Sequence, residues 1–156
     1  VVVVRRDLLG QARPETPTVV DWTQMAGADS MVTTPPTFGI YLLGKILAWV
    51  ERQGGTEGIG RINREKAEAL YGFIDGHDFY SNPVAPNARS MMNVPFLLAK
   101  PELDKQFVAE ATAAGLTNLA GHRSVGGMRA SIYNAMPREG VDALLQFMDD
   151  FAKQNR

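Results

Sequence analysis

The sequence contains no cysteine, and this absence excludes several kinds of chemistry. Without a thiol there can be no disulfide framework, no cysteine nucleophile and no Cys-ligated zinc or iron–sulfur site. Neither sign of charge is in excess, because 16 Lys and Arg residues against 17 Asp and Glu residues leave a net charge of −1. A surface that tracks nucleic-acid phosphates is therefore not expected, although a local anion site stays open.

Long hydrophobic runs are also missing. No apolar stretch approaches the roughly 20 residues that cross a bilayer, so we expect no membrane partner. The run Val1–Val4 is too short for a signal-peptide core and is typical of a strand buried on both faces. Such a strand needs neighbours and no comparable run follows, so we expect Val1–Val4 to belong to something larger. The 156 residues suffice for one core.

Apolar residues at helical spacing predict helices over most of the chain. Residues 7–32 are mixed and indicate a loop-rich connection. Prolines open three of the four predicted helices, because the first-turn N–H groups of a helix have no partner in any case. Glycines end three of the four, because glycine readily adopts the backbone conformation that follows a helix. The predicted helices cover about residues 35–54, 58–75, 101–115 and 137 to near the C-terminus.

Short strands are predicted at 92–98, near 116–119 and at 128–133. Pro95 indicates an edge strand or a bulge, because proline has no N–H to donate. The last strand places Arg129, Ser131 and Tyr133 on one face. The resulting order of elements predicts an α/β fold class, an α+β two-layer domain with a small sheet and helices on one side.

The densest polar cluster is Gly121-His122-Arg123, followed by Gly126-Gly127 and Arg129. Arginine presents a planar donor fork that matches a carboxylate or phosphate, and glycine lets the backbone approach a ligand. The cluster is therefore a candidate anion site. The alternative is that the arginines lie on the surface and the paired glycines form a hairpin turn.

A second candidate is Thr33-Thr34, just before the helix that opens at Pro35-Pro36. Helix N-termini attract anions, so the hydroxyls could receive a phosphate there. The alternative is N-capping by Thr34. His77 and Asp78 have no third group at metal-ligand spacing, so no metal site is predicted. Nothing local marks any of the lysines as a desolvated, activated amine; they are Lys45, Lys66, Lys100, Lys105 and Lys153.

Three segments resemble the phosphoserine aminotransferases, a family of class V aminotransferases: Ser30–Phe38, Arg89–Phe96 and Gly121–Pro137. They occur in the family's order and approximate spacing, and the likeness extends from about Val1 to Phe151. The resemblance implies the fold-type I architecture of pyridoxal 5'-phosphate enzymes and amino transfer between glutamate and 3-phosphohydroxypyruvate in serine biosynthesis. In some bacteria it also implies a role in pyridoxine biosynthesis. It further implies a cytoplasmic homodimer with shared active sites.

The resemblance also implies roles for individual residues. Thr33 and Thr34 match the positions that hold the cofactor phosphate from the neighbouring subunit, although several relatives have asparagine at the position of Thr33. His122 and Arg123 match the pair that receives the substrate phosphate. Arg129 matches the arginine that pairs with the substrate α-carboxylate.

The resemblance places the family's catalytic centre outside these residues. Its Schiff-base lysine, the aspartate on the pyridine nitrogen and the residue stacked on the ring lie upstream of the segment matching Val1–Leu9. We therefore expect residues 1–34 to be a remnant of the large cofactor-binding domain and residues 35–156 to form the C-terminal small domain. The chain alone is expected to be inactive, with no catalytic residue of its own. The alternatives are another class V aminotransferase, or a non-catalytic anion-binding or dimerisation module.

Overall fold

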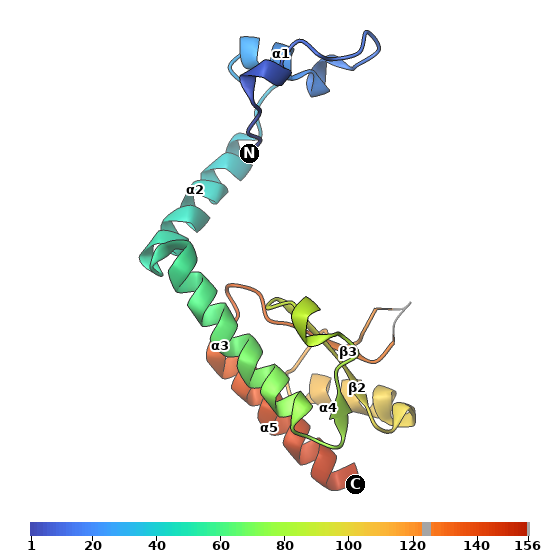
Figure 1. Cartoon of the computed structure of the whole chain (residues 1–156). Coiled ribbons are helices and arrows are strands. Elements are labelled where there is room, and N and C mark those ends of the chain that lie inside the picture. Colours follow the sequence, from blue (N-terminus) through green and yellow to red (C-terminus); the bar gives the residue numbers. More distant parts are fainter. Residues whose placement is uncertain (123–125, 156) are drawn as a thin grey trace. The chain divides into compact units, whose positions relative to one another are not determined.

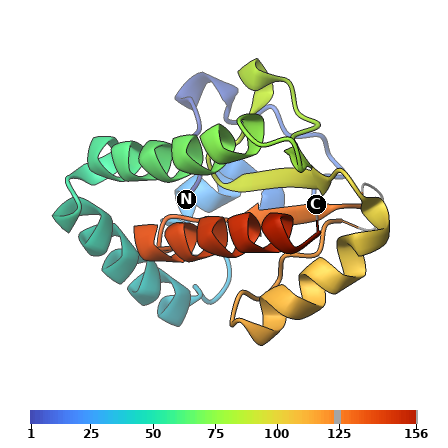
Figure 2. The same ribbon diagram turned by 90° about the horizontal axis from the view of Figure 1, so that it is seen from below.

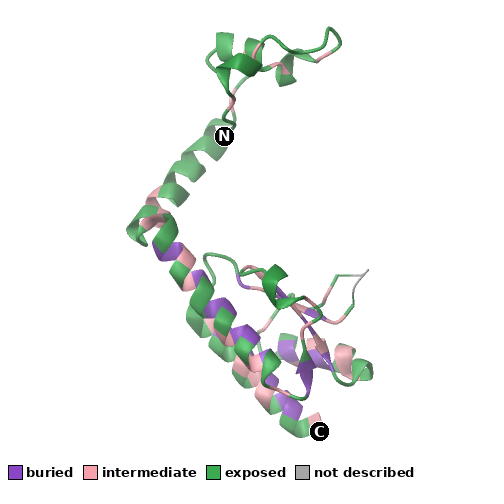
Figure 3. Ribbon diagram, in the orientation of Figure 1, coloured by how far each residue is buried: buried purple, intermediate pink, exposed green. Residues whose placement is uncertain are grey.

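The computed structural model describes residues 1–122 and 126–155, and its contacts divide the chain into two units, Val1–Trp49 and Val50–Arg156. All of residues 1–49 are described, and none of them is buried. Figure 3 shows that the buried residues gather from α3 (Gly55–Asp75) onward. The hydrophobic core of the described chain therefore lies within the second unit.

The first unit contains short helical segments and extended chain. Turns of 3-10 helix cover Arg6–Leu8 and Thr18–Val20, and the helix α1 covers Trp22–Gly27, so the loop-rich prediction for 7–32 missed only short elements. Asp21 caps α1, since its carboxylate accepts a hydrogen bond of 2.9 Å from the Thr23 amide. Val1–Val4 forms no strand and Val1–Val3 are exposed, so the buried strand expected there is absent from this structure.

The helix α2 (Thr37–Arg52) starts directly after Pro36 and ends before Gly54, whose φ of 89° only glycine adopts readily. This confirms the helix predicted over 35–54. None of its residues is buried. The large apolar side chains of its first three turns are all exposed: Phe38, Ile40, Tyr41, Leu42, Leu43, Ile46 and Leu47.

Three helices of the second unit confirm the remaining helix predictions. The long helices α3 and α5 (Arg138–Asn155) lie side by side, as Figures 1 and 2 show. The helix α4 (Asp104–Ala113) follows a turn of 3-10 helix at Pro101–Leu103, and Gly115 takes a φ of 85° beyond its end. The apolar stripes that predicted these helices face the core, with Ile59, Leu70, Phe107, Val141 and Met148 all buried.

The sheet has three antiparallel strands in the order β1 (Tyr80–Ser81), β2 (Asn93–Leu98) and β3 (Met128–Ser131). The predictions for β2 and β3 are confirmed, and β1 was missed because two residues show no alternation. The strand expected near 116–119 is wrong. Residues 116–119, all of them described, form no strand, and the following residue, Ala120, makes one isolated bridge to Met128.

Pro95 lies in the middle strand, which differs from the edge or bulge we expected. Its carbonyl accepts a hydrogen bond of 2.6 Å from the Asn82 side chain, and Asn82 lies just beyond β1. The N–H and C=O of one strand residue point to the same side. Because β1 pairs only with Leu97 and Leu98, the N–H that proline lacks points to a side where no strand continues.

One face of the sheet packs against α3, α4 and α5, which confirms the two-layer α+β prediction. Alternate residues of β2 are buried, and in β3 Met128 and Ala130 point the same way. Aromatic rings meet edge-on in this core: Phe107 lies 5.8 Å from Phe96 and 5.0 Å from Phe151, between ring centroids. The opposite face of the sheet carries Asn93, Pro95 and Leu97 of β2 and Arg129 and Ser131 of β3.

Candidate functional site

Polar side chains occupy the sheet face that turns away from the helices. We call Asn93, Arg129, Ser131 and Tyr133 the polar sheet face. Asn93 and Ser131 are directly opposite in register, and the Ser131 hydroxyl donates to Asn93 Oδ1 at 3.1 Å. The Tyr133 hydroxyl donates to the same oxygen at 3.4 Å. Arg129 and Ser131 alternate with the buried Met128 and Ala130, which confirms the predicted shared face.

Arg129 is the cation of this face. Its backbone is fixed, since its amide donates to the Leu119 carbonyl at 2.8 Å and its Cα is in register with Pro95. Its side chain is half-buried, and the Nε atom is buried without a hydrogen-bond partner in the part of the chain that the structure describes. A buried donor without an acceptor is costly. A carboxylate or phosphate bound to the guanidinium would remove that cost, so the donor set fits an anion.

A glycine-rich hairpin leads into β3 and carries His122. The Gly121 amide donates to the Gly127 carbonyl at 2.9 Å, and the Gly126 amide donates to the His122 carbonyl at 2.8 Å. Gly126 and Gly127 both take positive φ, 77° and 60°. The hairpin-turn alternative therefore accounts for the glycines, but it gives no reason for a histidine and an arginine between them in the sequence. His122 is exposed on this hairpin.

Arg123 lies outside the described residues, so its predicted role is neither supported nor weakened by the structure. His122 and Arg129 both belong to the second unit and lie seven positions apart in the sequence. Thr33 and Thr34 belong to the first unit.

Thr33 and Thr34 are exposed residues just ahead of α2. The helix begins at Thr37, so the residue before it is Pro36, and Thr34 does not take the N-cap position that the alternative requires. Among the described residues, neither threonine hydroxyl makes a hydrogen bond within the chain. Two uncommitted hydroxyls near the first turn of a helix are a donor set that fits a phosphate group.

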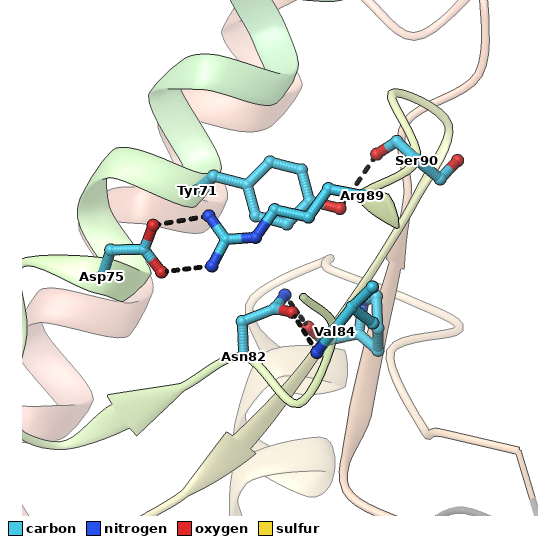
Figure 4. A network of polar contacts seen from close by, with 7 residues as sticks. Tyr71, Asp75, Asn82, Val84, Arg89 and Ser90 are labelled. Atoms are coloured by element: carbon cyan, nitrogen blue, oxygen red, sulfur yellow. Dashed lines mark hydrogen bonds and ion pairs between the residues drawn. The ribbon is translucent and has the colours of Figure 1, made fainter. Parts of the chain in front are cut away.

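An arginine that sequence reasoning left without a role fixes the chain before β2 (Figure 4). Arg89 forms two parallel hydrogen bonds with the Asp75 carboxylate, 2.5 and 2.7 Å long, and its guanidinium lies 4.6 Å from the Tyr71 ring centroid. The hydrogen bond from Arg89 lowers the pKa of Asp75, whereas burial raises the pKa of Tyr71. Tyr71 in turn donates to the Ser90 carbonyl at 2.9 Å. This network ties the end of α3 to the segment that carries Asn93.

Lys66 is the second residue that sequence reasoning missed. Its side chain is 0% exposed, and burial lowers its pKa. The expectation that no lysine is desolvated is therefore wrong for Lys66. The signal was its spacing, because Lys66 falls seven residues after Ile59 and four before Leu70, on the buried stripe of α3.

Metal-binding clusters and membrane-spanning helices are both absent from the described residues. Across residues 1–122 and 126–155, no group of histidine, aspartate and glutamate side chains is arranged to hold a metal ion. No helix in the same part of the chain combines the length and apolar character of a membrane span.

Sequence comparison places the chain in a known family. Residues 1–144 match the aminotransferase class-V family. The phosphoserine aminotransferase of Acinetobacter baumannii is 57% identical over 155 residues, which are 99% of this chain and 43% of that protein. The Marinomonas sp. phosphoserine aminotransferase is 54% identical over the same shares. The chain thus spans 43% of the length of these curated relatives.

Solved structures agree in fold. The phosphoserine aminotransferase of Bacillus circulans subsp. alkalophilus superposes with a TM-score of 0.92 at 44% identity, covering 98% of this chain and 43% of that one. A pyridoxal-phosphate-bound phosphoserine aminotransferase from Trichomonas vaginalis gives 0.81 at 40% identity, covering 88% of this chain and 40% of its own.

Proposed function

The chain belongs to the class V aminotransferases, and we propose that it forms the C-terminal part of a phosphoserine aminotransferase. That enzyme would transfer an amino group between glutamate and 3-phosphohydroxypyruvate. The observation that carries the proposal is Arg129, a half-buried arginine on a rigid strand whose buried Nε has no partner among the described residues. Such a group is suited to a carboxylate of defined orientation.

In this proposal the two anionic ends of the substrate are held separately. Arg129 binds the α-carboxylate, and His122 and Arg123 bind the phosphate. Fixing both ends orients the bond between Cα and its hydrogen for proton transfer. Asn93, Ser131 and Tyr133 extend the same polar sheet face beside Arg129.

Pyridoxal 5'-phosphate would supply the stabilisation of charge at Cα when bound. In this chain Thr33 and Thr34 would hold its phosphate, an assignment supported by their uncommitted hydroxyls near the start of α2. We assign residues 1–34 to the remainder of a large cofactor-binding domain and residues 35–156 to the small domain. A homodimer with shared sites, a cytoplasmic location and a role in serine or pyridoxine biosynthesis stay predictions.

A transamination assay tests the proposal. The complete enzyme that contains this chain, loaded with cofactor, is expected to convert phosphoserine and 2-oxoglutarate to 3-phosphohydroxypyruvate and glutamate, and to use unphosphorylated serine far less well. Residues 1–156 assayed alone are expected to show no turnover. Equal activity with serine would favour another class V aminotransferase. Binding of phosphoserine without turnover by any form would favour a non-catalytic anion-binding module.

A further inference from the structure

Lys66 is the one fully buried charged side chain in the described part of the second unit. Its Nζ donates to three backbone carbonyls, those of Ile132 at 3.3 Å, Tyr133 at 2.8 Å and Met136 at 2.9 Å. Within the described residues no carboxylate forms an ion pair with it. Burying an ammonium group without a counter-ion is costly, so the three carbonyls are what makes its position tolerable.

These carbonyls belong to the connection that leaves β3 and leads to α5. Asn63, three residues before Lys66 on α3, makes a second tie to the same connection, since its Nδ2 donates to Asn134 Oδ1 at 2.7 Å. The connection itself turns back through a 2.9 Å hydrogen bond from the Met136 amide to the Tyr133 carbonyl. One face of α3 thus holds the connection at several points.

The connection controls the end of β3 because β3 is an edge strand. The outer side of its first half is held by Leu119 and Ala120. The strand β3 ends at Ser131. Just beyond it, the Ile132 amide donates a hydrogen bond of 2.8 Å to the Met92 carbonyl. Tyr133, whose carbonyl Lys66 binds, turns its hydroxyl to Asn93 on the polar sheet face.

We propose that Lys66 is a positioning residue for this anion site. By binding the carbonyls of Ile132, Tyr133 and Met136 it fixes the end of β3, and so the placement of Arg129 and Tyr133 against the substrate carboxylate. An apolar side chain of the same length would fill the space but remove the ammonium donor from all three carbonyls. The Tyr133 carbonyl would keep its hydrogen bond from the Met136 amide, and the Ile132 and Met136 carbonyls would lose the donor that Lys66 provides. This inference rests on the proposed function, because the ligand it concerns is phosphoserine.

The first test replaces Lys66 in the complete, cofactor-loaded enzyme. Lys66→Met keeps the aliphatic length and removes the ammonium group, and Lys105→Met makes the same change at an exposed position of α4. We expect Lys66→Met to raise KM and the calorimetric Kd for phosphoserine by about ten- to a hundredfold, because small displacements of binding groups cost that much. The change in kcat is expected to be much smaller, and Lys105→Met is expected to match the wild type.

The second test restores the missing group. Lys66→Ala lacks the three carbons and the ammonium beyond Cβ, which n-propylammonium supplies. In the Lys66→Ala variant, added n-propylammonium is expected to lower the KM for phosphoserine, and the effect is expected to saturate as its concentration rises. n-Propanol at equal concentration is expected to leave this KM unchanged. If Lys66→Met does not fold, the experiment with Lys66→Ala and n-propylammonium tests the inference instead. The inference would be overturned if n-propylammonium restored the folding of Lys66→Ala but did not lower its KM for phosphoserine.

The remaining outcomes separate the two proposals. A folded Lys66→Met variant with a lower urea midpoint but an unchanged KM and Kd would show that Lys66 serves stability alone, and would overturn the inference while leaving the function intact. A wild-type enzyme that neither binds nor converts phosphoserine would overturn the proposed function and the inference with it.

Discussion

Arg129 and Lys66 show how burial sets what a single cation can do. Arg129 keeps part of its guanidinium accessible and has an unpaired Nε among the described residues, so it is free to bind an anion. Lys66 is fully buried and its ammonium group already donates to three backbone carbonyls, so it is not accessible to a ligand. Two cations in one unit therefore take a binding role and a positioning role.

Replacing Arg129 tests the binding role. Lys cannot reproduce the two parallel hydrogen bonds of a guanidinium, so Arg129→Lys is expected to cost about 1.5–3 kcal/mol of substrate binding, roughly a ten- to hundredfold loss in kcat/KM. Steady-state kinetics with phosphoserine measure this. Arg61→Lys, at a position whose side chain is 73% exposed, is the matched control and is expected to change kcat/KM less than about twofold. An unchanged kcat/KM for Arg129→Lys would remove Arg129 from the site.

The Asp75–Arg89 pair makes a prediction about pH. Because the hydrogen bond from Arg89 lowers the pKa of Asp75 in the folded protein, the ionised carboxylate stabilises the fold above the unfolded pKa of about 3.9, and the gain is lost as pH falls through the lower folded value. Asp75→Asn is expected to cost below about 1 kcal/mol near pH 7, since Asp75 is 47% exposed.

Urea unfolding across pH checks this prediction. The difference in unfolding free energy between wild type and Asp75→Asn should narrow below about pH 4. Asp142→Asn, which removes a carboxylate from an exposed ion pair with Arg138 within one helix, is the control. A difference that stays constant with pH would mean that Arg89 does not favour the ionised carboxylate.

At the scale of elements, the hairpin before β3 depends on glycines for two separate reasons. Gly126 and Gly127 both have positive φ, which strains any other residue. Only Gly127 is also crowded, since a Cβ there would lie 2.8 Å from the Phe96 carbonyl oxygen and 2.5 Å from Leu97 Cδ2. At Gly126 a Cβ would meet nothing within 4 Å.

Alanine at each glycine separates strain from crowding. Gly126→Ala is expected to lower the unfolding free energy by about 1–2 kcal/mol through strain alone. Gly127→Ala is expected to lower the unfolding free energy by about 1–3 kcal/mol more than Gly126→Ala does, because Phe96 lies in the middle strand and cannot move away. Denaturant unfolding of both variants measures the difference. Equal decreases in unfolding free energy for the two variants would show that β2 shifts to make room for the added methyl group.

At the scale of the whole molecule, the two units differ in what they bury. The buried hydrophobic residues of the described chain lie between Ile59 and Ala152, whereas residues 1–49 contain none. The first turns of α2 expose a run of large apolar side chains, with Phe38 at 72% and Leu47 at 58%. Apolar surface of this extent favours association with another surface.

We expect residues 1–156 to self-associate at micromolar concentrations through α2. The double substitution Ile46→Glu and Leu47→Glu should lower the mean mass seen by light scattering, because it puts charge into the apolar surface. Gln53→Glu, an added charge just beyond the end of α2, is the control and should leave the mass unchanged. A wild-type chain that stays monomeric at all concentrations would contradict the prediction.

Local sequence was sufficient for the four longer helices, the two longer strands and the sharing of a face by Arg129 and Ser131. These features depend on residue spacing, on proline and glycine at helix ends and on the alternation of a strand, which neighbouring residues encode. The motif around His122 and Arg129 could likewise be read as an anion site, although its hairpin alternative could not be dismissed from spacing alone.

Only the tertiary structure decided the features that depend on contacts between distant residues. Pro95 sits in a middle strand because β1 stops short of it, and residues 116–119 form no strand because pairing with β3 is reduced to one bridge at Ala120. The spacing of Lys66 places it on the apolar stripe of α3, but its three acceptors are carbonyls some seventy residues away. Hydrogen-bond partners that lie far apart in the sequence are properties of the folded chain, so no local pattern contains them.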